Sequence, residues 1–319
     1  MKSITVGLFT YQRPKYLQRQ LQFFKDLGYD FRLIILDGSH DGDLQRANEN
    51  IAKSFQVEYH HIIDLRERYI FFSENLDSEF AAWCADDDLI VPSYYNSAAA
   101  YMSQNPQYSV VTGQLYTLHY SLSPKWWGYF LRNHLGNHYD IFQGDFVEKI
   151  VRKDQAYALG CPPTYYGVRR FENIKLLCKY VSDLKLYSSI ERLENVCNLL
   201  QGGIKTINVL MGFRDYSSEP TREAQRDDPS IYISEEDTSV LQNIIKQELK
   251  KVVNPELLDY YASYAWPLPL RPAQNTQIHI EFGIKERLES MLNLFFGHHH
   301  NFEKAVSQAM RKNALRYIK

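Results

Sequence analysis

Three consecutive carboxylates, Asp86, Asp87 and Asp88, follow directly after the apolar run at residues 80–85. A buried strand of a parallel sheet that carries polar groups only at its carboxyl end has this pattern. Adjacent carboxylates repel one another unless a cation neutralises them, and their oxygens suit Mg²⁺ or Mn²⁺ together with the phosphates of a nucleotide. This acid triplet is therefore a candidate metal site, with a solvated loop or the first turn of a helix as the alternative.

Two other apolar runs end in polar residues that could lie beside the acid triplet. Residues 4–9 lead into Thr10, and residues 31–36 lead into Asp37. Strands and helices that alternate at this length predict an α/β fold with a doubly wound, mostly parallel sheet. Because crossovers between parallel strands are right-handed, Thr10, Asp37 and Asp86 should lie at one edge of that sheet, where open α/β sheets bind ligands.

The other elements are predicted from local periodicity and from signals for helix ends. Pro14 suits the first turn of a helix, and apolar residues then recur with helical period up to Gly28, which suits a helix end. By the same criteria we expect further strands at 57–63, 108–116 and 204–211, and further helices at 68–76, 94–104, 171–177 and 188–200.

The order and spacing of three motifs resemble glycosyltransferase family 2, whose members have the GT-A fold. The motifs are Thr-Tyr-Gln-Arg at 10–13, Asp-Gly-Ser at 37–39, and the acid triplet, which stands where the family has its DxD motif. The triple-Asp variant is similar to a bacterial subgroup of polysaccharide transferases. Two positions depart from the family pattern, because Leu36 replaces an Asp and Gln12 replaces an Asn. The resemblance extends over about residues 1–215.

The resemblance implies a site that holds a nucleotide sugar through a divalent ion, Mn²⁺ or Mg²⁺. Asp88 would be the direct metal ligand, and Asp86 would be a second ligand or would accept a hydrogen bond from a ribose hydroxyl. Asp87 would contribute to donor binding beside them. An ion held in this way stabilises the negative charge that develops on a departing nucleoside diphosphate.

Further residues of the motifs would bind the nucleoside and the diphosphate of the donor. By the resemblance, Thr10, Tyr11 and Arg13 lie against the nucleoside, and Asp37 hydrogen-bonds the base. Arg68 is a candidate partner of the diphosphate, because a guanidinium group matches the geometry of phosphate oxygens. A surface Arg on a polar helix has the same sequence context and is the alternative for Arg68.

An inverting transfer needs a carboxylate at the mouth of the site to take the proton of the acceptor hydroxyl. Glu191 lies eleven residues before Gly202 and by this spacing aligns with the catalytic acid of the family. The same residue also fits a capping box, in which Ser188 or Ser189 caps the helix. We therefore predict Glu191 as the general base, with a capping role as the alternative and Glu194 as the second candidate for the base.

The chain is expected to contain a GT-A domain at 1–216, a loop or linker at 217–233 and a helical C-terminal extension at 234–319. Just before the first boundary, Arg214 resembles the basic residue that many such transferases bring over the diphosphate from a mobile loop. The extension is expected to be helical because apolar residues recur with helical period. The two stretches with this period are 240–252 and 288–296.

Three further features of the sequence have several interpretations. The adjacent Trp126 and Trp127 could form a stacking platform for the acceptor, a membrane anchor or the filling of an apolar gap. The three His at 298–300 are expected to lie in a loop, because consecutive side chains do not face one another on a helix. The basic C-terminal end, which includes Arg311 and Lys319, is expected to be a solvated helix face, with contact to anionic lipid as the alternative.

Composition limits the class of partner. The chain has 319 residues and a net charge of −2, which gives no indication of a nucleic-acid partner. Its four cysteines lack a paired or metal-binding spacing, so we expect thiols in a reducing compartment. We find no apolar stretch long enough for a transmembrane helix and no signal peptide. A cytoplasmic protein is expected, with peripheral contact to the inner face of the membrane possible.

The sequence therefore predicts a metal-dependent glycosyltransferase of hexosyltransferase type, which moves a sugar from a nucleotide-sugar donor to a saccharide or lipid-linked acceptor. Inversion and a role in cell-surface polysaccharide synthesis are expected. The alternatives are a metal-dependent nucleotidyltransferase or phosphatase, and a catalytically degenerate scaffold that only binds nucleotide. A haloacid-dehalogenase-like phosphatase is disfavoured because the first strand ends in Thr10. The presence of Asp86, Asp88 and Glu191 disfavours a degenerate protein.

Overall fold

The computed structural model describes residues 4–120, 129–133, 140–141, 143–158, 164–215 and 235–265. Its strands are β1 (Ile4–Thr10), β2 (Arg32–Asp37), β3 (Glu58–His61), β4 (Phe80–Ala85), β5 (Leu89–Ile90), β6 (Tyr108–Tyr120), β7 (Tyr129–Asn133), β8 (Asp140–Ile141), β9 (Val168–Arg170) and β10 (Gly203–Asp215). Its α-helices are α1 (Pro14–Leu27), α2 (Gly42–Phe55), α3 (Leu65–Glu74), α4 (Pro92–Gln104), α5 (Phe146–Ala158), α6 (Phe171–Tyr180), α7 (Tyr187–Gln201), α8 (Glu235–Leu249) and α9 (Leu258–Ala262).

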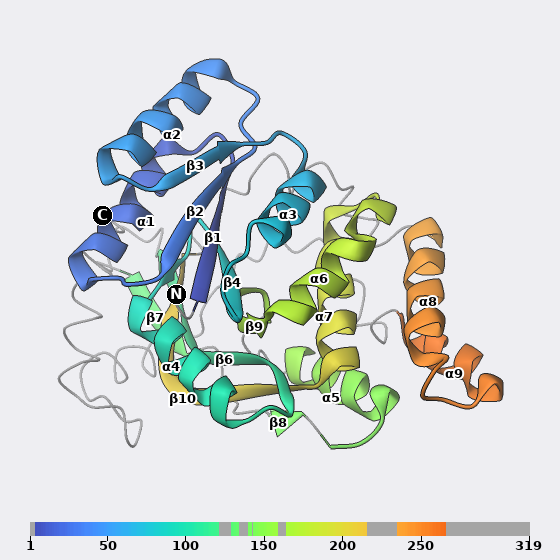
Figure 1. The fold of residues 1–319 in the computed structure, drawn as a ribbon. Helices are drawn as coiled ribbons and strands as arrows, with labels where there is room; N and C mark the ends of the chain where they lie inside the picture. The colour runs from blue at the N-terminus through green and yellow to red at the C-terminus, as the bar shows by residue number, and fades with distance from the viewer. Residues whose placement is uncertain are drawn as a thin grey trace.

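A single mixed sheet runs through the described part of the chain (Figure 1), with its main strands in the order β3-β2-β1-β4-β9-β6-β10-β5. The strands β3, β2, β1 and β4 are parallel to one another. The short β9 lies antiparallel between β4 and β6, so β6 and its parallel neighbour β10 again run in the direction of β4. The prediction of an α/β fold with a mostly parallel sheet is therefore confirmed.

The strand ends meet as the crossover rule predicts. Thr10 pairs with Asp37 across β1 and β2, and Phe9 pairs with Ala85 across β1 and β4. The residue after Ala85 is Asp86, so Thr10, Asp37 and Asp86 share one edge of the sheet. This edge is where the loops that carry the three motifs come together.

Helix α2 was not expected from the sequence, although its start has a recognisable signal. The Asp41 side chain accepts hydrogen bonds from the backbone N–H groups of Asp43 and Leu44 at 2.9 and 3.0 Å. An Asp in this role satisfies amide groups that have no partner inside the helix. Helix α5 also lies in a stretch for which no helix was predicted.

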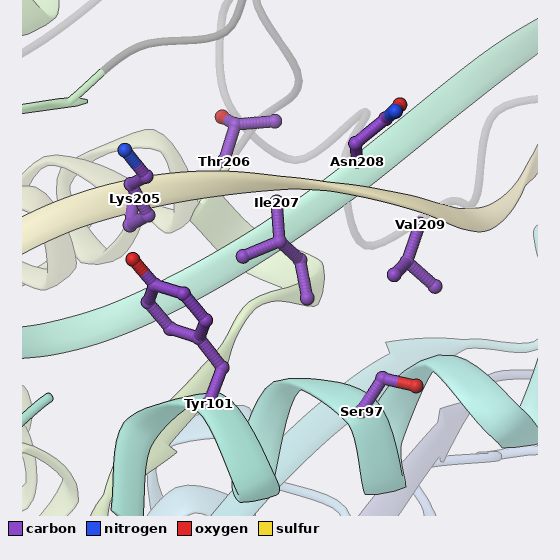
Figure 2. A pocket seen from close by; sticks show the side chains of 7 residues that line it. All are labelled: Ser97, Tyr101, Lys205, Thr206, Ile207, Asn208 and Val209. Atoms are coloured by element: carbon purple, nitrogen blue, oxygen red, sulfur yellow. The ribbon is translucent and has the colours of Figure 1, made fainter. Parts of the chain in front are cut away.

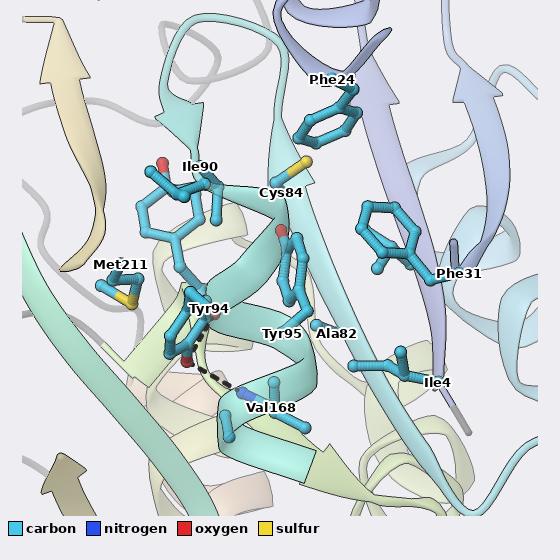
Figure 3. Close-up of a cluster of buried hydrophobic side chains, with 14 of the residues drawn as sticks. Ile4, Phe24, Phe31, Ala82, Cys84, Ile90, Tyr94, Tyr95, Val168 and Met211 are labelled. Carbon is cyan, nitrogen blue, oxygen red and sulfur yellow. Dashed lines mark hydrogen bonds between the residues drawn. The ribbon is translucent and has the colours of Figure 1, made fainter. Parts of the chain in front are cut away.

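Two apolar clusters cover the two faces of the sheet, because successive strand residues point to opposite sides. Ile4, Val6 and Leu8 of β1 pack against α1 and α4, and Figure 3 shows Tyr94 and Tyr95 of α4 in this cluster. The second cluster contains residues of β2 and β4 together with α3, α5, α6, α7 and α8. The helix that carries Glu191 therefore packs between the sheet and the C-terminal helices.

The described part of the C-terminal extension is helical and packs on the body of the protein. Leu241, Ile244, Ile245 and Leu249 of α8 lie in the same apolar cluster as residues of α6 and α7, and Figure 1 shows α8 alongside α7. In the described residues, no helix is both long and apolar enough to cross a membrane.

Several predictions fall outside the described residues. They concern the linker at 217–233, the apolar stretch at 288–296, the three His at 298–300, the basic C-terminal end, and Trp126 and Trp127.

Candidate functional site

Two basic side chains from α1 and the loop before it hold the first part of the acid triplet. Thr10 Oγ1 donates to Asp86 Oδ2 at 2.6 Å, and Arg13 Nη2 donates to Asp86 Oδ1 at 2.5 Å. The other terminal nitrogen of Arg13 donates to the Asp87 carboxylate at 3.0 Å. Arg19 bonds the Asp87 carbonyl oxygen at 2.6 Å. The repulsion between Asp86 and Asp87 is thus offset by a cation of the chain itself.

Burial has a strong effect on the Asp86 carboxyl group, which is inaccessible to solvent. Loss of water raises the pKa of Asp86 to about 7; the charge of Arg13 opposes the rise and that of Asp87 adds to it. Proximity to Arg13 therefore offsets only part of the cost of burying this charge.

Asp88 has different partners from its two neighbours. Its carboxylate is 3% exposed and accepts a hydrogen bond from the Tyr166 hydroxyl group. Arg214 of β10 approaches it, with 3.9 Å between Arg214 Nε and Asp88 Oδ2. Strand β10 brings Arg214 there because Gly212 and Phe213 pair with β5, which begins one residue after Asp88.

The donor set around the acid triplet fits a divalent ion that is shared with a nucleotide. Within the described residues, no three His, Cys, Asp or Glu side chains are grouped so as to hold an ion by themselves. Asp88 provides carboxylate oxygens beside Arg214, whereas Asp86 is bonded to Arg13 and Thr10. Mg²⁺ characteristically binds one or two carboxylates and completes its shell with water and substrate phosphates. These residues therefore fit an ion that phosphate oxygens help to hold.

Asp37 builds the loop beside the acid triplet. Its buried carboxylate accepts four hydrogen bonds from described residues: the backbone N–H and Oγ of Ser39 at 2.8 and 2.6 Å, Asn48 Nδ2 at 3.0 Å and the Tyr59 hydroxyl at 2.7 Å. The Ser39 hydroxyl in turn accepts from the backbone N–H of Gln12 at 2.8 Å. A nucleobase would have to displace one of these partners to bond the Asp37 carboxylate. The geometry makes Asp37 a support for the 10–13 loop.

Arg68 is buried under the strand ends, so its alternative assignment as a surface residue is wrong. The side chain is 1% exposed, and its Nη1 lies 3.4 Å from the Thr10 carbonyl oxygen. A Cβ atom on Gly38 would come within 2.5 Å of the Arg68 guanidinium group, so a larger residue at this position would displace that side chain. Tyr11, also buried, lies edge-to-face on His40 at a ring distance of 5.8 Å.

Glu191 reaches the same region from α7. Its side chain is exposed, yet loss of water is the largest cause that raises the pKa of its carboxyl group, followed by the charge of Glu194. The charges of Arg214 and Lys153 lower the pKa of Glu191. Arg214 Nε thus lies 3.9 Å from Asp88 Oδ2, and its charge also lowers the pKa of Glu191.

The capping-box interpretation of Glu191 is wrong. Helix α7 begins at Tyr187, and its N-cap is Leu186, which provides no side-chain cap. Ser188 and Ser189 lie inside the helix, and Glu191 is already in its second turn. A capping-box Glu belongs to the third helical position, so Glu191 has no such role here.

Glu194 is placed differently from Glu191 although it is only three residues away. It is 3% exposed and forms an ion pair with Arg169, which is 1% exposed. The Arg169 guanidinium lies 4.1 Å from the Trp83 ring. A base must meet the acceptor hydroxyl, and the burial of Glu194 does not suit that task.

Tyr166 and Lys153 are close to the site but were not among the predicted site residues. Tyr166 belongs to a 3₁₀ turn, η1 (Thr164–Tyr166), and bonds Asp88. Lys153 lies on α5 and is 2% exposed, and its charge lowers the pKa of Glu191. Lys153 has no local sequence signal, because it reaches the site through the packing of a distant helix.

A cavity of about 520 Å³ lies elsewhere, between α4 and β10. Figure 2 shows the side chains that line it: Ser97, Tyr101, Lys205, Thr206, Ile207, Asn208 and Val209. The β10 strand shifts its pairing register with β6 between Thr206 and Leu210. The lining contains no residue of the acid triplet or of α7, so this cavity is not where Asp88 and Glu191 converge.

No protein-family model and no curated protein sequence matches the chain. Solved structures do match it. The crystal structure of S. aureus TarS 1-349 in complex with UDP-GlcNAc has 13% sequence identity and a TM-score of 0.57, over 91% of this chain and 79% of TarS 1-349. The chain has the GT-A fold. A longer S. aureus TarS structure gives a TM-score of 0.55 at 13% identity over 92% of this chain. This chain spans 48% of that longer TarS chain.

Proposed function

We propose that this chain is a metal-dependent glycosyltransferase that moves a sugar from a nucleotide-sugar donor to a saccharide or lipid-linked acceptor with inversion. The observation that carries the proposal is the position of Arg214 beside the strand ends of a GT-A sheet, 3.9 Å from Asp88, where its charge also acts on Glu191. This arrangement combines a carboxylate for a metal, a cation for a leaving group and a carboxylate with a raised pKa. An inverting sugar transfer needs these three components.

The likeness to TarS supports a uridine diphosphate sugar as the donor, because that structure contains UDP-GlcNAc. In our proposal the nucleoside lies against Thr10, Tyr11 and Arg13. Asp37 holds this loop in place through Ser39 and does not itself contact the base. This assignment revises the role that the sequence alone suggests for Asp37, and it follows from the saturated hydrogen bonding of that carboxylate.

Charge on the diphosphate would be balanced from two sides. Asp88 would hold a divalent ion, which would supply positive charge that stabilises the leaving group. Arg214, whose side chain is 39% exposed, adds a second cation at the same place. Arg68 lies below the loop and supports Gly38, so we assign it to positioning the loop rather than to direct contact with phosphate.

In the transfer step, the acceptor hydroxyl oxygen bonds to the anomeric carbon of the donor sugar while the bond from that carbon to the diphosphate oxygen breaks. Glu191 takes the hydroxyl proton. Its raised pKa makes it a stronger base than an ordinary glutamate, which favours proton transfer near neutral pH. We place this reaction in cell-surface polysaccharide synthesis, in the cytoplasm or at the inner face of the membrane, on the basis of the resemblance.

The test is a thermal-shift screen of UDP, GDP, CDP and ADP, each with and without Mn²⁺. Ligand binding to the native state raises the melting temperature. We expect one diphosphate to do so only with Mn²⁺, and Asp88→Asn to abolish the effect. Asp43→Asn, which changes an exposed acid on α2, is the matched control and should behave as the unchanged protein. An equal shift for Asp88→Asn would remove Asp88 from the site.

Product analysis separates the proposed reaction from its alternatives. A glycosyltransferase supplied with UDP-GlcNAc and other nucleotide sugars releases a nucleoside diphosphate. A nucleotidyltransferase instead releases inorganic diphosphate from a nucleoside triphosphate. Binding of nucleotide without either product across a panel of saccharide and lipid-linked acceptors would favour a scaffold.

A further inference from the structure

Helix α7 receives its N-terminal cap from another helix. The Asp237 carboxylate of α8 accepts hydrogen bonds from the backbone N–H of Lys185 at 2.9 Å and of Leu186 at 3.0 Å. It also accepts from Ser189 Oγ at 2.6 Å. Asp237 is inaccessible to solvent and lies 48 residues beyond Ser189 in the sequence. The start of the helix that carries Glu191 is therefore held by the C-terminal extension.

The sequence of α7 explains why this external cap is needed. Its N-cap is Leu186, which has no side-chain acceptor, and its first turn contains no acidic residue. The first amide groups of a helix lack partners inside it, and the helix dipole makes that end positive. A buried carboxylate at this end both satisfies amide groups and meets a favourable field, which offsets the cost of its own burial.

The other end of α7 is also held by a charged side chain from a different element. Lys149 of α5 donates its Nζ to the carbonyl oxygens of Leu199 at 3.0 Å and Gly202 at 3.2 Å. A cation at the C-terminus complements the negative end of the dipole. α7 is thus clamped at both ends by charges of the stabilising sign, and its position depends on α5 and α8.

We propose that Asp237 is a positioning residue for the transfer reaction, which assigns a role to the C-terminal extension. By holding the first turn of α7, it sets the location of Glu191, two residues beyond Ser189, relative to Arg214 and Asp88. This inference rests on the proposed function, because it matters for catalysis only if Glu191 is the base. The extension then completes the active site without contributing a group that touches the substrate.

The proposal can be tested without knowing the natural substrate. Carboxyl ¹³C NMR of the full chain reports the pKa of Glu191, assigned by its loss in Glu191→Gln. Hydrogen exchange reports the protection of the amides at the start of α7. In Asp237→Ala we expect the pKa of Glu191 to fall toward the usual glutamate range and exchange of these amides to rise about tenfold, the factor expected from losing an ordinary cap. UDP binding in the presence of Mn²⁺ should stay within about twofold, because a cap acts within the first turn of its helix.

Two matched variants distinguish a positioning effect of Asp237 from an effect of its charge alone and from a general loss of α8 packing. Asp237→Asn removes the charge but keeps an oxygen acceptor, so it should retain most of the protection and a raised Glu191 pKa. Glu248→Gln weakens the contacts of α8 with Lys179 and Tyr180 of α6, and should leave α7 unchanged. If Asp237→Ala fails to fold, Ser189→Ala removes one donor of the cap and should give a smaller change in the same direction.

The inference is overturned if Asp237→Ala leaves the Glu191 titration and the α7 exchange as they are in Glu248→Gln. The inference is also overturned if Asp237→Asn shifts the pKa of Glu191 as much as Asp237→Ala does while the amides at the start of α7 stay protected. The loss of charge alone would then explain the shift. Failure of the proposed function gives a different result. In that case Glu191→Gln would keep full turnover, whatever Asp237 does to the position of the helix.

Discussion

Glu191 and Glu194 are only three residues apart on α7, and the same Glu→Gln substitution should lower turnover at one position and stability at the other. Glu191→Gln removes the proposed base, so turnover should fall by roughly 10²–10⁴-fold. Its stability should change by less than about 0.5 kcal/mol, because the side chain is exposed and takes no part in capping the helix. Glu194→Gln should lower stability instead.

The size of the Glu194 effect follows from its surroundings. Arg169 is 1% exposed, and its guanidinium bonds the carbonyl oxygens of Thr164 and Gly167 at 2.6 Å each as well as Glu194. Removing one partner of a buried ion pair costs about 3–5 kcal/mol. Gln keeps a neutral acceptor, and charged hydrogen bonds are about twice as strong as neutral ones. We therefore expect Glu194→Gln to lose about 2–3 kcal/mol.

The assay combines urea unfolding with release of nucleoside diphosphate, measured where both variants remain folded. Glu194→Gln should unfold at a lower urea concentration and keep turnover within a few-fold of the unchanged enzyme. Glu191→Gln should show the reverse. If Glu194→Gln is as stable as the unchanged protein, the ion pair with Arg169 is not the interaction that matters. If turnover collapses only in folded Glu194→Gln, the base is Glu194.

Three further predictions concern the loops and the titration of the base. Gln12 has a φ of 55°, a left-handed conformation that Asn tolerates better than Gln. Gln12→Asn should therefore raise the free energy of unfolding, measured in urea melts, by about 0.5 kcal/mol. A lower free energy of unfolding would mean that the Gln side chain stabilises the loop. Gly38→Ala should cost about 1 kcal/mol by displacing the Arg68 guanidinium, and a double-mutant cycle should show no cost in an Arg68→Ala background. A base acts only when it is deprotonated, and the pKa of Glu191 is raised. As the pH is lowered, turnover should therefore begin to fall at a pH above the usual glutamate pKa range. Turnover that stays constant until the pH is below that range would argue against Glu191 as the base.

Local sequence patterns predicted β1, β2, β3, β4, β6 and β10 and the sheet edge that carries Thr10, Asp37 and Asp86, but they did not predict β5, β7, β8 and β9. An apolar run that ends abruptly in polar residues predicts a buried parallel strand, and this pattern identified β1, β2 and β4, which end at Thr10, at Asp37 and just before Asp86. The crossover rule then placed the three ends at one edge, as the structure has them. Helix ends marked by Pro14 and Gly28 were also readable, because the preferences of these residues are local.

The roles of individual carboxylates were decided by tertiary structure. Asp37 is saturated by Ser39, Asn48 and Tyr59, and Asp86 is engaged by Arg13, although both acids stand at strand ends. Glu191 is exposed, whereas Glu194 is buried and forms an ion pair with Arg169, which β9 brings in. A capping box is readable in the sequence at 188–191, but α7 starts earlier and takes its cap from Asp237.

The physical reason is the range of the interactions. Burial of strands and the start of many helices depend on neighbours in sequence, so residue type and spacing are enough to predict them. The charge state and reach of a carboxylate depend on cations, hydroxyl groups and amides that crossovers and helix packing bring from tens of residues away. For this protein, the sequence alone determined which carboxylates stand at the strand ends, and only the folded arrangement determined which acid is ion-paired, which is buried and which remains exposed to solvent.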